Sequence, residues 1–309
     1  MRVFITGASG WIGSAVVPEL IGAGHRVAGL ARSDASAAAL AAAGVEVRRG
    51  SLDDFDVLRE EAGAADAVVH LAFKHDLAFS GRFGDAVAAD RAVVEAIGDA
   101  LAGTGKAFAL ASGTPESPGA VATEDDGHDF APDRPGPMAR MATAEYLLGL
   151  AARGVRSIVL RFPPTVHGEG DHGFIAALVG VAREKGLSGY IGDGTSRWAA
   201  VHRADAAVLV RLAIERAPAG STLHAVADEG VPMRDIAAVV GRHLGVPTAS
   251  VAPEDAAAHF GWLAAFAGAD RAGSSARTRE LLDWEPTHPG LVEDLEKGHY
   301  FETGRPQAA

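Results

Sequence analysis

The chain has 309 residues, of which 48% are hydrophobic, so it can form one large or two modest domains with a substantial core. A net charge of −12 without a basic patch argues against nucleic acid as a partner, and the absence of cysteine excludes disulfides, thiolate nucleophiles and cysteine-ligated metals. No apolar run reaches transmembrane length and the first residues already indicate a strand, so we expect a cytoplasmic protein that contacts no membrane.

A glycine motif opens the chain. Residues Thr6–Gly13 follow a short β-rich run and precede apolar residues at helical spacing. Such a strand-to-helix turn suits a dinucleotide, because glycines allow a tight turn close to the pyrophosphate and the helix N-terminus offers N–H groups. An ordinary turn is the alternative, since a single glycine motif is a weak signal. The predicted cofactor-binding residues here are Gly7, Ser9, Gly10, Trp11, Ile12 and Gly13.

Strand and helix patterns then alternate. After the first helix, which Pro18 should bend if it starts near Trp11, the expected elements are strand 25–32, helix 35–43, strand 45–50, strand 67–73, helix 85–101, strand 107–111, helix 140–152 and strand 157–162. This order predicts an α/β fold with a doubly wound parallel sheet of the Rossmann type. We expect a dinucleotide-binding domain over 1–162 and a smaller substrate-side region over 163–309, part of which returns to the first domain.

Two later segments have distinct compositions. The proline-rich stretch Pro115–Pro137 is expected to be a long surface loop, with its acidic residues 124–126 solvated. Between Pro253 and Arg271, apolar residues recur at helical spacing. This helix either packs on the sheet or forms a lid over an apolar substrate. Its aromatics Phe260, Trp262 and Phe266 would then form the wall together with Phe73, Phe130, Phe174 or Trp198.

Motifs along nearly the whole chain resemble the extended and atypical short-chain dehydrogenase/reductases. They lie at 6–13, 50–54, 69–72, 160–168, 201–205 and 282–286. The resemblance implies a Rossmann domain that binds NAD or NADP and a C-terminal substrate domain. It also implies that Ser51 and Leu52 border the adenine, that Leu71, Ala72 and Phe73 pass the ribose, and that Pro163 and Val166 belong to the cofactor site.

The catalytic pair of that family, a tyrosine and a lysine four residues later, is absent. The three tyrosines, Tyr146, Tyr190 and Tyr300, are followed four residues later by leucine or glycine. Arg140 lies in the corresponding stretch. An arginine there could hold the ribose and supply positive charge, but it could not donate a proton, because it does not titrate. The sequence therefore resembles the atypical branch, in which basic residues replace the pair.

Further candidates follow predicted strands. Arg32 ends the second strand, where an arginine suits the 2′-phosphate of NADP, although nearby Asp34 leaves NAD as a less favoured alternative. His75 is either a general acid or a surface histidine. Ser112 and Thr114 are either substrate-orienting hydroxyls or turn residues.

Histidines and an aspartate also cluster at His167, Asp171 and His172. Their spacing matches no zinc signature, so we expect no metal site.

Three functional hypotheses follow. The first is an NADP-dependent oxidoreductase that reduces a carbonyl or imine in a small, fairly apolar substrate, with Arg140, His75, Ser112 and Thr114 as catalytic residues. The others are an isomerase or lyase with structural NADP and a dinucleotide-sensing regulator. A homodimer through the helices at 85–101 and 140–152 is also expected, unless their apolar stripes only cover the sheet.

Overall fold

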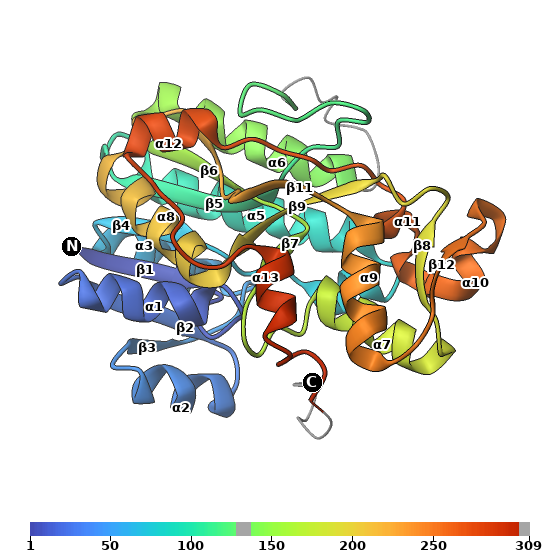
Figure 1. Ribbon diagram of the computed structural model, residues 1–309. Helices are drawn as coiled ribbons and strands as arrows, with labels where there is room; N and C mark the ends of the chain where they lie inside the picture. Colours follow the sequence, from blue (N-terminus) through green and yellow to red (C-terminus); the bar gives the residue numbers. More distant parts are fainter. Residues whose placement is uncertain (128–136, 303–309) are drawn as a thin grey trace.

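Parallel strands and helices alternate through the first half of the structure, a computed structural model that describes residues 1–127 and 137–302 (Figure 1). The elements of this half are β1 (Arg2–Thr6), α1 (Gly13–Gly22), β2 (Arg26–Ala31), α2 (Asp34–Ala42), β3 (Glu46–Arg49), α3 (Phe55–Ala64), β4 (Ala67–His70), α4 (His75–Phe79), α5 (Phe83–Leu101), β5 (Ala107–Gly113), α6 (Pro137–Gly149), the 3₁₀ turn η1 (Leu150–Arg153) and β6 (Arg156–Phe162).

The main sheet has seven strands in the order β10-β6-β5-β4-β1-β2-β3, and all neighbouring pairs are parallel. Strand order runs outward in both directions from the β1–β4 pair, in which Thr6 is the register partner of His70. In such sheets ligands bind beyond the carboxyl ends of the strands, at the point where the order reverses. The α/β fold class and the Rossmann-type sheet are therefore confirmed, and the switch point lies between β1 and β4.

The second half of the chain adds two smaller sheets and returns to the large one. Its elements are β7 (Thr165–His167), α7 (Phe174–Lys185), β8 (Ser188–Ile191), β9 (Arg197–His202), α8 (Arg203–Arg216), β10 (Ser221–His224), β11 (Asp228–Pro232), α9 (Met233–Leu244), β12 (Thr248–Val251), η2 (Pro253–Asp255), α10 (Ala256–Phe260), η3 (Gly261–Leu263), α11 (Ala264–Ala267), α12 (Ala276–Leu282) and α13 (Leu291–Glu296). Strand β10 joins the edge of the main sheet beside β6, while β11-β9-β7 and β12-β8 form separate sheets.

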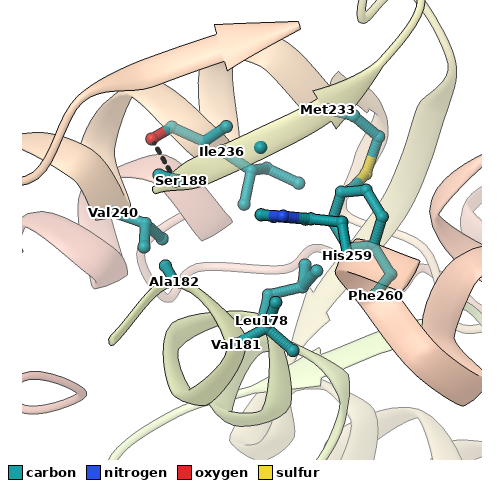
Figure 2. Close-up of a pocket in the computed structure, with 11 residues that line it drawn as sticks. Leu178, Val181, Ala182, Ser188, Met233, Ile236, Val240, His259 and Phe260 are labelled. Carbon is teal, nitrogen blue, oxygen red and sulfur yellow. Dashed lines mark hydrogen bonds between the residues drawn. The ribbon is translucent and has the colours of Figure 1, made fainter. Parts of the chain in front are cut away.

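The apolar segment after Pro253 is a broken helix rather than a continuous one. Gly261 adopts φ +57°, a left-handed conformation that ends α10, and the chain restarts in η3 and α11. Phe260 is buried in a core formed by α7, β8 and α9, where it lines a narrow apolar cavity with Met233 and Leu178 (Figure 2). The expected lid is therefore wrong for Phe260. Trp262 remains 55% exposed, and Phe130 lies outside the described residues.

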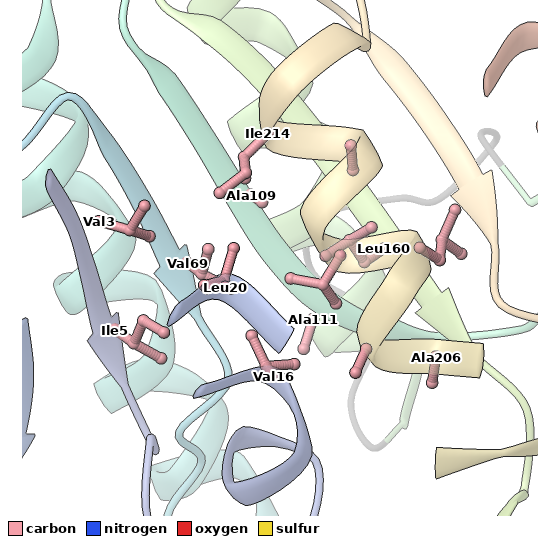
Figure 3. Packing of buried hydrophobic residues seen from close by; sticks show 14 of the residues in the cluster. Val3, Ile5, Val16, Leu20, Val69, Ala109, Ala111, Leu160, Ala206 and Ile214 are labelled. Carbon is pink, nitrogen blue, oxygen red and sulfur yellow. The ribbon is translucent and has the colours of Figure 1, made fainter. Parts of the chain in front are cut away.

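Helices cover both faces of the main sheet, because successive strand residues point to opposite sides. One apolar layer joins Val3, Ile5, Val69 and Leu160 to α1 and α8 (Figure 3). The other joins Phe4, Val68, Phe108 and Leu110 to α3, α5 and α6. The strands are buried on both sides, as a parallel sheet with two helical layers requires.

Several predicted boundaries differ from the structure. Helix α1 begins at Gly13, with Pro18 inside it, and the helix α3 was not predicted. Strand β4 ends at His70 instead of Phe73, because its ladder partner β1 ends at Thr6 where the glycine turn begins. Glu124 is buried and accepts hydrogen bonds from the Thr278 N–H and hydroxyl at 2.8 and 2.6 Å, so a solvated acidic face was the wrong expectation for that residue.

The broken helix predicts different roles for its two large aromatics. Phe260→Ala should cost about 3–5 kcal/mol of unfolding free energy, because it removes a core side chain. Trp262→Ala should stay within about 1 kcal/mol, because more than half of this side chain is already in water. Urea denaturation of both variants measures the difference, and equal losses would contradict it.

Candidate active site

The glycine turn is folded against the end of β4. Gly7 has φ +75°, and a Cβ on it would lie 2.7 Å from the backbone nitrogen of Ala72. A Cβ on Gly13 would lie 2.1 Å from the Gly7 carbonyl oxygen. Neither position tolerates a side chain without a backbone shift. The structure therefore brings the predicted residues Leu71 and Ala72 directly beside the predicted turn.

Backbone donors of this turn are available to an anion. The Gly10 N–H donates to the Gly7 carbonyl at 3.0 Å, whereas the N–H groups of Trp11 and Ile12 have no backbone acceptor in the described part of the chain. Ser9 and Gly10 are exposed. Free N–H groups before a helix, in a turn too tight for side chains, suit a pyrophosphate. This donor set fits a dinucleotide.

Trp11 ties the turn to the second half of the chain. Its indole N–H donates to the Val166 carbonyl at 2.7 Å. The Arg203 guanidinium lies 3.9 Å from the centre of the indole ring and donates to the Ser14 hydroxyl at 2.8 Å. Val166 thus contacts the glycine turn itself, while Pro163 is buried directly after β6. Sequence reasoning had given Arg203 no role.

The end of β2 carries an arginine without a partner in the structure. Arg32 is exposed, and no hydrogen bond or ion pair joins it to residues 1–127 or 137–302. Asp34, by contrast, pairs with Arg49 at 2.8 Å, and Arg49 also donates to the Ser33 carbonyl at 2.6 Å. The Asp34 carboxylate, which kept NAD as an alternative cofactor, therefore forms a surface ion pair with Arg49 at the end of β3. The sequence did not indicate this partner.

The loop after β3 is closed by its own side chains. The Ser51 N–H and hydroxyl both donate to Asp54, at 2.6 and 2.9 Å, and these bonds lower the pKa of that carboxyl. Leu52 packs against the helical layer of α3, and Lys74 after β4 pairs with Asp53 at 2.7 Å. The two loops expected to border the adenine and ribose are thus joined to each other.

Arg140 and His75, two of the predicted catalytic residues, both contact Phe73, which follows β4. Arg140, on α6, donates to the Ala111 carbonyl at 3.2 Å and lies 4.2 Å from the centre of the Phe73 ring. The ring of His75 contacts the same phenylalanine edge-on, with 5.3 Å between centroids. Ser112 lies in β5 next to Ala111, and Thr114 directly follows the strand, where its N–H donates to the Phe162 carbonyl at 3.0 Å. The Phe73 ring therefore lies between Arg140 and His75 and contacts both.

Within residues 1–127 and 137–302, several polar atoms at this edge of the sheet are buried without a hydrogen-bond partner. They are the hydroxyls of Ser112 and Thr114 and the Nε of Arg140. A buried polar group without a hydrogen bond costs free energy, so such groups in a folded protein call for a partner that binds later. Two hydroxyls and a cation next to a dinucleotide turn can bind the oxygen of a substrate.

Burial and neighbouring charges shift the pKa values of Arg140 and His75. Burial lowers the pKa of Arg140, and the Asp90 carboxylate opposes that shift. Burial and the Arg140 cation together lower the pKa of His75. A lowered pKa leaves His75 largely neutral at neutral pH, while the residue itself is exposed, so its role as a general acid stays a prediction.

A buried chain of side chains behind the site was missed. His70 is fully buried; its Nδ1 lies 2.5 Å from the Thr6 hydroxyl and its Nε2 lies 3.2 Å from Asp90 Oδ1. His70 belongs to the motif 69–72, but the motif alone does not show that a helix 20 residues later supplies an acid. The apolar pattern of α5 was the available signal, because Asp90 falls on its buried face.

Four aromatic side chains from the second half of the chain form a cluster. Phe174 contacts Trp198, Trp262 and Phe266, with ring centroids 5.7, 5.7 and 4.7 Å apart. The segment before Phe174 reaches the turn, because His172 packs edge-on against Trp11 at 5.7 Å. Four of the aromatics named for an apolar wall thus form one cluster, and the segment before Phe174 connects it to the glycine turn.

The arginines near this cluster are already paired. Arg197 binds Asp270 through two nitrogens, at 2.9 and 2.7 Å, and Arg271 pairs with Glu116. Arg271 also donates to the Thr114 carbonyl at 3.4 Å. Because their charges are balanced inside the protein, these side chains are poorly placed to bind a diphosphate.

The histidines and aspartate near residue 170 do not converge. His167 is fully buried against Asp294 at 3.0 Å, Asp171 accepts from the Tyr300 hydroxyl at 2.9 Å, and His172 faces Trp11. Over residues 1–127 and 137–302, no three side chains of the metal-ligating types are grouped to hold an ion. In the same residues, no helix is long and apolar enough to cross a bilayer.

Known proteins match the chain over most of its length. The profile of the NAD dependent epimerase/dehydratase family matches residues 3–226. An uncharacterised protein of Schizosaccharomyces pombe is 45% identical over 97% of this chain and 100% of its own length. A 4-hydroxy-2-methyl-3-oxo-4-farnesyl-3,4-dihydroquinoline-1-oxide ketoreductase of Stigmatella aurantiaca is 29% identical over 71% of this chain and 66% of its own.

The fold also has close structural counterparts. The UDP-glucose 4-epimerase of Thermotoga maritima, solved with UDP-glucose, superposes with a TM-score of 0.76 over 97% of this chain and 98% of that one, at 20% identity. At this identity the likeness concerns the fold. Together with the family match, the open dinucleotide turn and the missing Tyr-x-x-x-Lys pair, it leads to one assignment. The chain belongs to the NAD-dependent epimerase/dehydratase family, an extended branch of the short-chain dehydrogenase/reductases, and is an NAD(P)-dependent oxidoreductase with an atypical catalytic site.

Proposed function

We propose that the protein is an NADP-dependent reductase of a carbonyl or imine in a small, fairly apolar substrate. One observation carries the proposal. A buried arginine with an unmet donor and two unmet hydroxyls lie at the sheet edge beside the dinucleotide turn. This arrangement offers hydrogen-bond donors and positive charge to a substrate oxygen or nitrogen that gains negative charge.

The cofactor would be held by residues that fit it. The N–H groups of the glycine turn would bind the pyrophosphate, Ser51 and Leu52 would border the adenine, and Arg32 with Ser33 would bind the 2′-phosphate. When bound, the nicotinamide supplies the hydride. The preference for NADP rests on the exposed Arg32, because the Asp34–Arg49 ion pair lies in solvent and leaves the Asp34 carboxylate accessible.

The protein's own contribution would be orientation, charge and a proton. Arg140 would stabilise the negative charge that develops on the substrate oxygen as its carbon is reduced. The Ser112 or Thr114 hydroxyl would donate the proton that completes the alcohol and would regain one from water. His75, kept neutral by burial and by Arg140, would line the site rather than carry this proton. Each role falls to a residue already grouped at the edge of β4 and β5.

The substrate side would be supplied by region 163–309. Its aromatic cluster around Phe174 would offer a neutral apolar surface, of which Trp262 is exposed, and its nearby arginines are paired with acids. The printed name of the Stigmatella ketoreductase, which describes a farnesylated quinoline, supports an apolar carbonyl compound. A nucleotide sugar would need free cations for its phosphates.

Turnover itself is tested with a substrate panel. NADPH absorbance at its reduced-nicotinamide band is followed while ketones, aldehydes, imines and a UDP-sugar are added in turn. The proposal expects oxidation with at least one uncharged ketone, aldehyde or imine. Interconversion of a substrate without net NADPH loss would favour the isomerase or lyase instead.

Cofactor preference depends on Arg32. NADPH should bind at least about tenfold more tightly than NADH, which requires only ~1.4 kcal/mol of charge-assisted hydrogen bonding. Arg32→Ala should remove the difference, whereas Arg26→Ala, at the exposed opposite end of β2, should keep it. Fluorescence titration with both cofactors measures the affinities. Equal affinities in the unmodified protein would refute the preference.

Catalysis depends on Arg140. Arg140→Ala should fold and bind NADPH but lose about 10²–10³-fold in kcat, because a donor to the developing oxyanion is removed. Arg59→Ala changes an exposed arginine on α3 and should leave kcat unchanged. Steady-state kinetics on the best substrate of the panel decide this. An active Arg140→Ala enzyme would place Arg140 outside the chemistry.

The helices α5 and α6 would also join two copies of the chain. They pack side by side, and Ala88 is exposed while Ala92 is half-buried on α5. Two faces of small side chains allow close helix contact. Light scattering at micromolar concentration should give the mass of a dimer, and Ala88→Arg should shift it toward the monomer. A monomeric mass for the unmodified protein would contradict the interface.

A further inference from the structure

A positive charge lies beside the glycine turn without an acidic partner. The Arg203 guanidinium lies 3.9 Å from the centre of the Trp11 ring, and its Nη2 donates to the Ser14 hydroxyl at 2.8 Å. No carboxylate forms an ion pair with it within residues 1–127 and 137–302. Trp11 also carries one of the backbone N–H groups that the turn leaves unpaired in the described part of the chain, so the cation is held next to these donors.

The same two helices balance a cation elsewhere along their contact. Helices α1 and α8 pack against each other, and further from the turn Arg211 of α8 donates to Glu19 of α1 at 2.6 Å. At the turn, the partner of Arg203 on α1 is the neutral hydroxyl of Ser14. The first turn of a helix carries partial positive charge, so a cation there is unfavourable until an anion joins it. The helix pair therefore has unbalanced positive charge at the end where the dinucleotide turn lies.

The surroundings fix the position of this guanidinium. The Trp11 indole N–H donates to the Val166 carbonyl at 2.7 Å, which orients the ring on which the guanidinium lies. Gly168 leaves room for the side-chain stem, because a Cβ there would lie 3.1 Å from Arg203 Cγ. Arg203 is itself half-buried and is the first residue of α8. A cation that is already ordered loses little conformational entropy when it binds an anion.

We propose that Arg203 is a second cationic binding residue for the cofactor, that it contacts the diphosphate, and that Trp11 positions it there. A dinucleotide is the ligand of the family to which the chain belongs. Its diphosphate is the anion that suits the free N–H groups of the turn, and a guanidinium binds phosphate oxygens through charge-assisted hydrogen bonds. NAD and NADP share this group, whereas Arg32 would contact the 2′-phosphate that distinguishes NADP. The inference is therefore independent of the substrate and of the preference for NADP.

Cofactor fragments separate the roles of the two arginines. Arg203→Met keeps an unbranched stem on the ring but removes the charge, so it should weaken NADPH and NADH alike, each at least about tenfold. Adenosine 2′-monophosphate carries no diphosphate, and at about 0.15 M salt charges more than about 8 Å apart are largely screened, so its affinity should change less than about twofold. Arg32→Ala should give the opposite pattern, with weakened binding of this fragment and unchanged binding of NADH. Arg216→Met, at the exposed other end of α8, is the matched control and should change none of the three affinities.

Calorimetric titration measures NADPH and NADH, and displacement of NADPH measures the fragment. Unchanged NADH affinity in Arg203→Met would overturn the proposal. So would a loss confined to NADPH, because the shared diphosphate would then not be the group bound. If the unmodified protein binds NADH as tightly as NADPH, the preference for NADP fails instead, and the NADH measurement still tests Arg203.

Two further measurements distinguish binding from a structural role. The urea midpoint of the cofactor-free protein should be unchanged or raised in Arg203→Met, because an unbalanced cation is removed. A lowered midpoint together with weakened adenosine 2′-monophosphate would show a structural role and overturn the proposal. Arg203→Lys keeps the charge and should bind NADH within about threefold of the unmodified protein. If Arg203→Met does not fold, this variant decides: retained NADH binding supports the proposal, and a tenfold loss contradicts it.

Discussion

The site depends on one close contact, between the glycine turn after β1 and the backbone that follows β4. A Cβ on Gly7 would lie 2.7 Å from the Ala72 nitrogen, so only glycine lets these two segments meet. This contact ends the ladder of β1 and β4 at Thr6 and His70 and directs the chain beyond His70 out over the sheet edge. Phe73, and through it His75 and Arg140, are placed by that change of direction.

The second constraint is the burial of a permanent cation. A tyrosine and lysine can exchange a proton, but arginine cannot, so Arg140 would contribute charge and hydrogen bonds alone. Burial of a guanidinium is costly unless charge and hydrogen bonds balance it. The Ala111 carbonyl and the Phe73 ring contact the guanidinium, and the Asp90 carboxylate opposes the shift in its pKa that burial causes. In the proposed reaction, proton delivery would then be left to the hydroxyls of Ser112 and Thr114, which are buried without a hydrogen-bond partner in the described part of the chain.

Sequence reasoning predicted the features that depend on local chain order, of which the sheet class is confirmed and the roles of the site residues stay predictions. The glycine turn, the sheet class, Arg32 and the grouping at the ends of β4 and β5 all follow from strand and helix alternation, which places carboxyl ends together. The bonds of Asp90 to His70 and of Arg49 to Asp34 could not be predicted, because each joins two separate elements and depends on side-chain orientation. Phe260 was assigned to a lid because a helical stripe does not show which neighbour buries it, and Gly261 breaks the helix.

Similar folds can serve different substrates, and the proposal of an apolar substrate rests on how charged side chains are paired in this chain. The Thermotoga epimerase shares the fold at 20% identity and was solved with UDP-glucose, whereas Arg197 and Arg271 of this chain are bound to Asp270 and Glu116. Transfer of deuterium from NADPH labelled at the nicotinamide C4 tests the central claim most directly. If the protein reduces an apolar carbonyl, mass spectrometry will find one deuterium on the new alcohol carbon. A product that carries no label from the cofactor would contradict the account.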